Sequence, residues 1–188
     1  FLMKQKKKAA MQKGRLLAKG LNAGPGAATG KVVFHAEDAV AHEKKGDNVI
    51  LVRIETSPED IRGMQSSQGI LTARGGMTSH AALVARQMGK VCVAGCEKLI
   101  IDYKARTIRV ADKDLVVKEG EEISIDGSTG EVLVGSIKTK PSDVVSVLIE
   151  KTMKPSQSAI YQRYAQVMKW ADEIRKLRVR VNADQPDQ

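Results

Sequence analysis

Residues 69–86 read GILTARGGMTSHAALVAR, a stretch that passes from a short apolar strand through a glycine-rich loop into a helix. The mostly apolar run ILTA (70–73) predicts a buried strand. Gly75 and Gly76 interrupt this pattern, and residues 80–89 consist mostly of helix formers. The stretch therefore predicts one strand–loop–helix unit, with a histidine in the first turn of the helix.

The segments on either side of this unit predict an α/β domain. NVILVR (48–53) is a continuous buried strand, SPED (57–60) has the residues of a capped helix start, and VCVAG (91–95) is a further strand. From residue 99 the pattern is all β, with turns at EG and STG. Strands joined by crossover helices are typical of α/β folds, so we predict a compact α/β domain over residues 21–137.

The segment before this domain predicts a helix and then a turn. Residues 4–19 favour a basic helix that ends at Gly20, and we assign residues 1–20 to an N-terminal linker helix. LNAGPGAATG (21–30) predicts a glycine-rich turn before a β-branched strand at 32–34. A dinucleotide-binding loop is not expected, because that motif needs a strand before the glycines and a helix after them.

The segment after this domain predicts a long helix. KTKPSD (138–143) interrupts the β pattern, and in residues 158–177 the apolar residues follow helical spacing. One amphipathic helix is expected there, either docked on a neighbour or serving as a linker, so we assign residues 138–180 to a helical linker. Residues 178–188 begin a new strand, and the first residue is Phe1, so we expect the chain to be part of a longer protein.

The composition excludes several classes of function. Of 188 residues, 42% are hydrophobic and 3% aromatic, enough for a core but too few aromatic rings for a base-stacking platform. No apolar run approaches the eighteen or so residues of a membrane helix, and the N-terminal residues lack the apolar core of a signal peptide. We therefore expect an intracellular protein without a membrane partner.

The formal net charge of +9 lies on the two ends of the chain. Residues 1–20 contain seven Lys and Arg and no acidic residue, and residues 151–181 contain eight basic residues against two acidic ones. Solvated helix faces are the favoured interpretation, and we expect no nucleic-acid partner. A nucleic-acid-binding module that uses these basic arms stays open as an alternative of another class.

The cysteines and two of the histidines do not predict a metal site. Three residues separate Cys92 from Cys96, which fits neither a redox motif nor half of a zinc site, and no second pair exists. We interpret both as buried thiols. His35 and His42 occur in the contexts of a strand end and a surface helix. We therefore assign no metal ligand to this chain.

The loop and helix start around His80 favour a phosphate-linked role. Backbone N–H groups at a helix start have no internal partner, and the helix dipole adds positive charge there, so such a terminus suits an anion. Gly75 and Gly76 let the backbone approach a bulky anion, and Thr78 and Ser79 can cap the helix. The same dipole favours the neutral imidazole, which is the nucleophilic form. The residues alone leave two interpretations of His80 open, a phosphorylated nucleophile and an ordinary capping or core histidine.

GGMTSHAALVAR (75–86), with TAR before it and MGKVCVAGC after it, resembles the phosphohistidine signature of the pyruvate phosphate dikinase family. Further segments agree in order and spacing: LNAGPGAATGKVVF (21–34), RIETSPEDIRGM (53–64), ISIDGSTGEVLVG (123–135) and VRVNADQP (179–186). Phosphoenolpyruvate synthase and enzyme I of the sugar phosphotransferase system share the GGxTxHxAxxAR pattern and stay open as alternatives. Met77, Ser79 and ETSPEDIRGM favour the dikinase family.

This resemblance implies the fold and the roles of individual residues. The fold would be a swivelling β/β/α phosphohistidine domain flanked by linker helices. His80 would carry a phosphoryl group on Nε2, as a tele-phosphohistidine, with Gly75, Gly76, Thr78 and Ser79 positioning the phosphate. Thr78 also matches the threonine that plant members phosphorylate to switch the enzyme off.

The resemblance also implies the reaction and the partners of the whole enzyme. ATP, pyruvate and phosphate would give AMP, phosphoenolpyruvate and diphosphate, with this chain as phosphoryl carrier and unable to turn over alone. An N-terminal ATP-binding domain and a C-terminal pyruvate/phosphoenolpyruvate-binding TIM-type barrel, beginning at residues 181–188, would belong to the same chain, in a homodimer. Mg²⁺ and a monovalent cation such as ammonium or potassium would bind outside this region. The enzyme would lie in the cytoplasm or in an organelle such as a plastid or glycosome.

Overall fold

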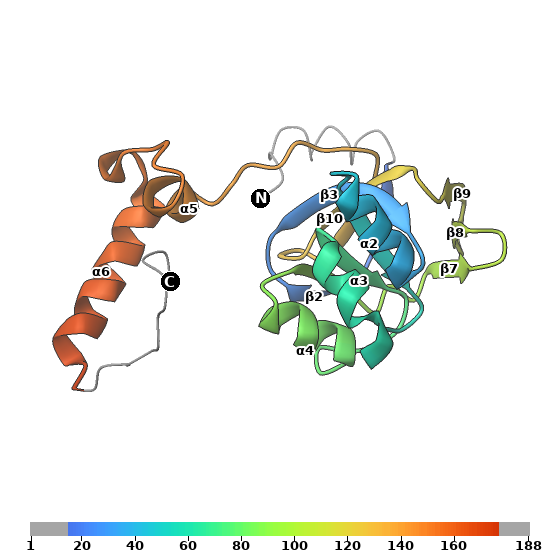
Figure 1. The fold of residues 1–188 in the computed structure, drawn as a ribbon, viewed down its shortest axis with the longest axis horizontal. Helices are drawn as coiled ribbons and strands as arrows, with labels where there is room; N and C mark the ends of the chain where they lie inside the picture. The colour runs from blue at the N-terminus through green and yellow to red at the C-terminus, as the bar shows by residue number, and fades with distance from the viewer. Residues whose placement is uncertain (1–14, 177–188) are drawn as a thin grey trace. The chain divides into compact units, whose positions relative to one another are not determined.

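A computed structural model describes residues 15–176 (Figure 1). The chain divides into two compact units, one ending at Lys140 and the other beginning at Pro141. The first unit holds two sheets and, in its described part, the helices that cover the larger sheet. The described part of the second unit contains helical segments.

The strands and helices of the first unit alternate in its first half, whereas its second half is all β. The helices among its described residues are α2 (Ala36–Lys44), α3 (Ile61–Ser66), which follows a 3-10 turn at Pro58–Asp60, and α4 (His80–Gln87). The strands are β1 (Leu16–Lys19), β2 (Leu21–Gly24), β3 (Ala27–Val33), β4 (Val49–Arg53), β5 (Gly69–Thr72), β6 (Val91–Ala94), β7 (Leu99–Asp102), β8 (Thr107–Val110), β9 (Lys113–Lys118), β10 (Glu122–Asp126) and β11 (Glu131–Val134).

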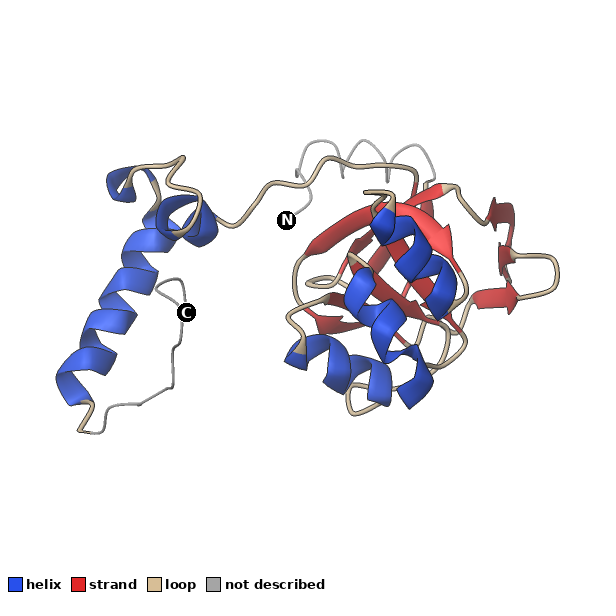
Figure 2. Cartoon of the chain, viewed as in Figure 1, coloured by secondary structure: helices blue, strands red, loops and turns tan. Residues whose placement is uncertain are grey.

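The larger sheet has eight strands in the order β1-β11-β10-β3-β4-β5-β6-β2. Strands β3, β4, β5 and β6 run parallel, and the other pairs are antiparallel. Parallel neighbours need crossover connections, which α2, α3 and α4 supply. Figure 2 shows these three helices together on one side of the sheet. Strands β7, β8 and β9 form a separate antiparallel sheet.

Strand β4 shows how the layers are held together. Its side chains alternate between two hydrophobic clusters, and both are buried, which explains the unbroken apolar run in the sequence. Val49 and Leu51 pack in the cluster that includes residues of α2, α3 and α4. Ile50 and Val52 pack in the cluster that includes residues of the three-stranded sheet and of β1, β10 and β11. This layering confirms the predicted α/β fold class with a β/β/α arrangement.

The predicted N-terminal helix is wrong for residues 16–19, which form strand β1. This strand pairs antiparallel with β11, with Ala18 opposite Val132. Leu17 and Ala18 are buried in the core, and a sheet partner far along the chain overrides the local helix preference of this segment. The preceding part of the predicted helix lies outside the described residues.

The predicted glycine-rich turn at 21–30 is also largely wrong, because most of this segment forms β2 and the start of β3. The glycines lie where other backbones come close. A Cβ atom on Gly24 would lie 2.6 Å from the carbonyl oxygen of Lys90, and one on Gly30 would lie 2.7 Å from that of Asn48. These glycines therefore permit close strand packing within the sheet.

The second unit contains α5 (Asp143–Leu148), a 3-10 turn (Pro155–Gln157) and α6 (Ala159–Ile174). Helix α6 confirms the predicted amphipathic helix, whereas α5 was not expected from the KTKPSD segment. Ser158 caps α6 by accepting a hydrogen bond from the Tyr161 N–H at 3.0 Å, and its hydroxyl donates to Asp143 Oδ2 at 2.8 Å. Within residues 15–176, no helix has the length and apolar character needed to cross a membrane.

Candidate functional site

Three loops meet at one edge of the parallel part of the sheet. Strand β4 is followed by Glu55 and Thr56, β5 by the loop 73–79 that leads to His80, and β6 by Gly95. Neighbouring parallel strands all end at the same edge, and ligands in open α/β sheets bind outside these carboxyl ends. The fold therefore brings the predicted site residues to the position where such sheets bind ligands.

Backbone hydrogen bonds fix the beginning of the loop that carries the signature. The Ala73 N–H donates to the Arg53 carbonyl at 3.0 Å, and the Arg74 N–H donates to the Ile54 carbonyl at 2.9 Å. The Thr72 hydroxyl donates to the Arg74 carbonyl at 2.7 Å. The loop after β5 thus stays attached to the loop after β4 beyond the end of the regular strands.

The two glycines of the signature have different environments. Gly75 has φ +99°, and a Cβ atom there would lie 2.9 Å from Cβ of Ser79, so this position requires glycine. Gly76 is exposed and has open space around a Cβ position. Gly95, which sequence reasoning missed, has φ +63°, and a Cβ there would lie 2.7 Å from the Gly75 carbonyl oxygen. Its position as the last residue of the predicted strand 91–95 was the available signal.

Helix α4 begins with Ser79 as its N-cap and His80 as its first residue. The Ser79 hydroxyl oxygen accepts from the Ala82 N–H at 3.4 Å, and the Ser79 N–H donates to the Gly76 carbonyl at 3.0 Å. Of the two predicted capping residues, Ser79 therefore occupies the cap position, whereas Thr78 lies exposed in the loop. The helix start directs its first residues toward the loop after β4.

Arg86, near the end of α4, ties the loop to the sheet. One guanidinium nitrogen donates to the Met77 carbonyl at 2.7 Å, and the other donates to the Ala23 carbonyl in β2 at 3.1 Å. The planar guanidinium can hold two acceptors at fixed positions. Sequence reasoning assigned Arg86 no role, although it is the last residue of the signature.

A recess of about 220 Å³ lies between these elements. Its lining comes from the loop after β4, the loop after β5 and the start of α4, with Glu55, Thr56, Arg74, Gly75, Ser79 and His80 among its residues. The Nε2 atom of His80 is buried and has no hydrogen-bond partner among the described residues. Three of the five predicted site residues, Gly75, Ser79 and His80, therefore line this recess, whereas Gly76 and Thr78 do not.

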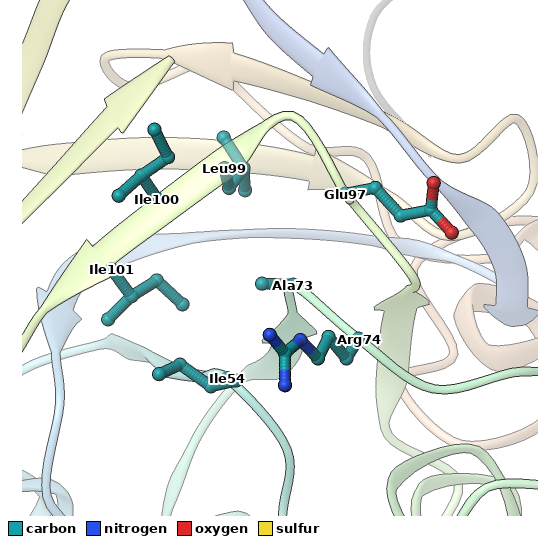
Figure 3. A pocket seen from close by; sticks show the side chains of 7 residues that line it. All are labelled: Ile54, Ala73, Arg74, Glu97, Leu99, Ile100 and Ile101. Carbon is teal, nitrogen blue, oxygen red and sulfur yellow. The ribbon is translucent and has the colours of Figure 1, made fainter. Parts of the chain in front are cut away.

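A second recess of about 480 Å³ adjoins the first through Arg74 (Figure 3). Its remaining lining is Glu97 together with apolar side chains, namely Ile54, Ala73, Leu99, Ile100 and Ile101. Figure 3 shows the Arg74 side chain lying beside Ile54. Most residues that line this recess are apolar, and Arg74 is the residue that it shares with the His80 recess.

The cysteines and the other two histidines lie outside both recesses. Cys92 and Cys96 are free and buried, and burial raises the pKa of each thiol to about 12, so neither is a ready nucleophile. His42 Nδ1 lies 2.8 Å from Asp47 Oδ2, and His35 precedes α2. Within the described part of the chain, no group of three or more His, Cys, Asp and Glu residues has a metal-binding arrangement.

Comparison with protein families identifies the class of domain to which this site belongs. The family described as "PEP-utilising enzyme, mobile domain" matches residues 45–130, which include the recess, His80 and the glycine loop. This region of the chain is therefore similar to the mobile domains of PEP-utilising enzymes.

Comparison with curated proteins confirms the resemblance to pyruvate, phosphate dikinases. Over 95% of this chain's length, the sequence is 47% identical to pyruvate, phosphate dikinase of Clostridium symbiosum. Over 92% of this chain's length, it is 48% identical to pyruvate, phosphate dikinase 1, chloroplastic, of Arabidopsis thaliana. It spans 18% and 16% of these two relatives. An NMR solution structure of Enzyme I matches 59% of this chain and 38% of that chain at 22% identity with a TM-score of 0.34.

The two signature glycines are expected to respond differently to substitution. Gly75→Ala should lower the free energy of unfolding by about 1–2 kcal/mol, because an alanine at positive φ is strained and its Cβ would press on Ser79. Gly76→Ala is the matched control and should change it by less than about 0.5 kcal/mol. Urea unfolding of both variants measures the difference, and equal losses would contradict the distinct roles.

Proposed function

We propose that this chain is the phosphoryl-carrier domain of a pyruvate, phosphate dikinase and that His80 carries the phosphoryl group on Nε2. The observation that supports this most directly is the unpartnered Nε2 of His80 at the start of α4, within the region that matches the mobile domain. The match to dikinases at 47–48% identity favours this reaction over those of phosphoenolpyruvate synthase and enzyme I. It also leaves the nucleic-acid alternative without a specific supporting observation.

The geometry supports a nucleophilic role for the imidazole. In the first transfer, the Nε2 lone pair attacks phosphorus, and the bond from phosphorus to the donor oxygen breaks. In the second transfer, the N–P bond breaks while an oxygen of the acceptor, the enolate of pyruvate, bonds to phosphorus. Free N–H groups and the dipole at the start of α4 stabilise the added negative charge, at about 0.3–1 kcal/mol for each such interaction.

The remaining partners belong to the proposal as well. Because the chain spans less than a fifth of its dikinase relatives, we place the ATP-binding domain and the pyruvate/phosphoenolpyruvate domain in other parts of a longer protein. Mg²⁺ and a monovalent cation would act on those domains. A homodimeric assembly and an intracellular location, in the cytoplasm or an organelle, stay predictions.

Replacing His80 tests the nucleophile. In the full-length enzyme, His80→Asn should abolish both half-reactions, because asparagine has no nucleophilic ring nitrogen, while circular dichroism stays unchanged. His42→Asn is the matched control, since His42 lies outside the recess, and it should keep wild-type activity. Isotope exchange between ATP and AMP measures the first half-reaction, and its persistence in His80→Asn would rule out this assignment.

The isolated chain tests the carrier role. The 188-residue chain should form no phosphoenolpyruvate from ATP, phosphate and pyruvate, because the substrate sites are proposed to lie on other domains. With a separate nucleotide domain it should become phosphorylated slowly, since losing the tether lowers the effective concentration. The bound phosphate should be acid-labile and base-stable, as a phosphoramidate is. Steady phosphoenolpyruvate formation by the chain alone would contradict the proposal.

Thr78 is the proposed position of regulatory phosphorylation. It is exposed in the loop, two residues before His80, where a modifying enzyme can reach it. A phosphate there adds about −1.5 to −2 charge close to the arriving phosphoryl group. Thr78→Asp in the full-length enzyme should therefore reduce kcat strongly, whereas Thr78→Val should have a much smaller effect. Equal kcat values for the two variants would remove the basis for a charge-based switch.

A further inference from the structure

Thr56 presents a buried hydroxyl without an assigned role. Its Oγ1 atom is buried and has no hydrogen-bond partner among the described residues. The backbone on either side is held firmly, because the Ile54 N–H donates to the Tyr103 hydroxyl at 2.8 Å and the Ser57 N–H donates to Asp60 Oδ2 at 2.9 Å. A buried hydroxyl without a partner costs free energy and therefore calls for an explanation.

His80 lines the same recess as Thr56, and its Nε2 atom is likewise buried without a hydrogen-bond partner among the described residues. Two residues that each carry a buried, unpaired polar atom thus line one space of about 220 Å³. A water molecule occupies about 30 Å³ in the liquid, so this space has room for a phosphoryl group with its four heavy atoms. A phosphoryl group on Nε2 would supply oxygens that can accept a hydrogen bond from the Thr56 hydroxyl.

Glu55 and Arg74 also line the recess, but their side chains are exposed. Solvent screens the charges of exposed side chains, so their effect on a group inside the recess is reduced. The Thr56 hydroxyl is buried, and a hydrogen bond from a buried donor to a charged oxygen is strong. Among the residues that line the recess, Thr56 is therefore well suited to hold a phosphoryl oxygen.

We propose that Thr56 is a catalytic residue whose hydroxyl donates a hydrogen bond to an oxygen of the phosphoryl group on His80. This inference rests on the proposed function. The hydrogen bond forms while Nε2 attacks phosphorus and the bond between phosphorus and the donor breaks. It persists until the N–P bond breaks and the phosphoryl group passes to the acceptor. Thr56 keeps its proton throughout, so the step needs no further reactant.

Phosphoramidate provides a test that needs no other domain. His80 Nε2 attacks its phosphorus, the P–N bond of the reagent breaks, and ammonia leaves. Phosphorus-31 NMR of the 188-residue chain then follows the formation of tele-phosphohistidine and, after removal of the reagent, its hydrolysis. Thr56→Val should form phosphohistidine roughly tenfold to hundredfold more slowly, because one hydrogen bond to a charged group is lost. Thr56→Ser should stay within about threefold of the wild-type rate, because it keeps the hydroxyl.

Thr107→Val is the matched control for the loss of a hydroxyl. Thr107 in β8 also has a buried hydroxyl without a hydrogen-bond partner, but it lies outside the recess. Both valine variants should keep the wild-type Tm or exceed it, since each removes an unpaired buried polar group. Thr107→Val should also keep the wild-type rate of phosphohistidine formation.

The possible results separate this inference from the proposed function. If Thr56→Val forms phosphohistidine at the wild-type rate, the role of Thr56 is overturned. The role is also overturned if Thr56→Val is slow but has a lower Tm than the wild type while Thr107→Val does not. Lack of phosphohistidine on the wild-type chain, or undiminished phosphorylation of His80→Asn, would overturn the proposed function and with it this inference.

Discussion

The parallel pairing of β4, β5 and β6 is the constraint on which the site depends. Leu51 lies opposite Ile70, and Leu71 lies opposite Val93, so the three strands end at the same edge of the sheet. Parallel neighbours must be joined by crossovers, which here are α3 and α4, and both begin at that edge. Side chains of β4 alternate between two hydrophobic clusters, and this alternation fixes the register. A shift by one residue would move each of these side chains into the opposite cluster.

Local patterns predicted the elements around this edge well. The apolar run of β4, the capped turn at Pro58–Asp60, strand β5 and the start of α4 all have signals within a few residues of sequence. The wrong predictions concern β1 and β2, whose partners β11 and β6 lie far along the chain. Pairing of this kind is decided by contacts between distant segments, which a local pattern does not contain.

The same distinction separates the residues of the candidate site. Gly75, Ser79 and His80 were predicted because they belong to one contiguous loop and helix start, where the chemistry is local. Thr56 and Gly95 were missed because their contributions arise only when the loops after β4, β5 and β6 meet. Gly76 and Thr78 belong to the same contiguous motif, yet they lie on the exposed side of the loop, so adjacency in sequence did not predict which side chains share a recess.

Under the proposed function, the hidden position of Nε2 balances two requirements of a carrier. A phosphohistidine must be kept from water during transit, and enclosure in a small recess limits hydrolysis of a reactive intermediate. It must also meet other domains, and apolar side chains of the loop and of α4 remain on the surface, with Met77 42% and Leu83 52% exposed. Gly76 in the same loop is exposed and has no side chain, so it leaves open space for an approaching phosphate. The recess that Thr56 lines is thus sheltered, whereas the loop that carries Gly76 and Met77 is exposed to an approaching domain.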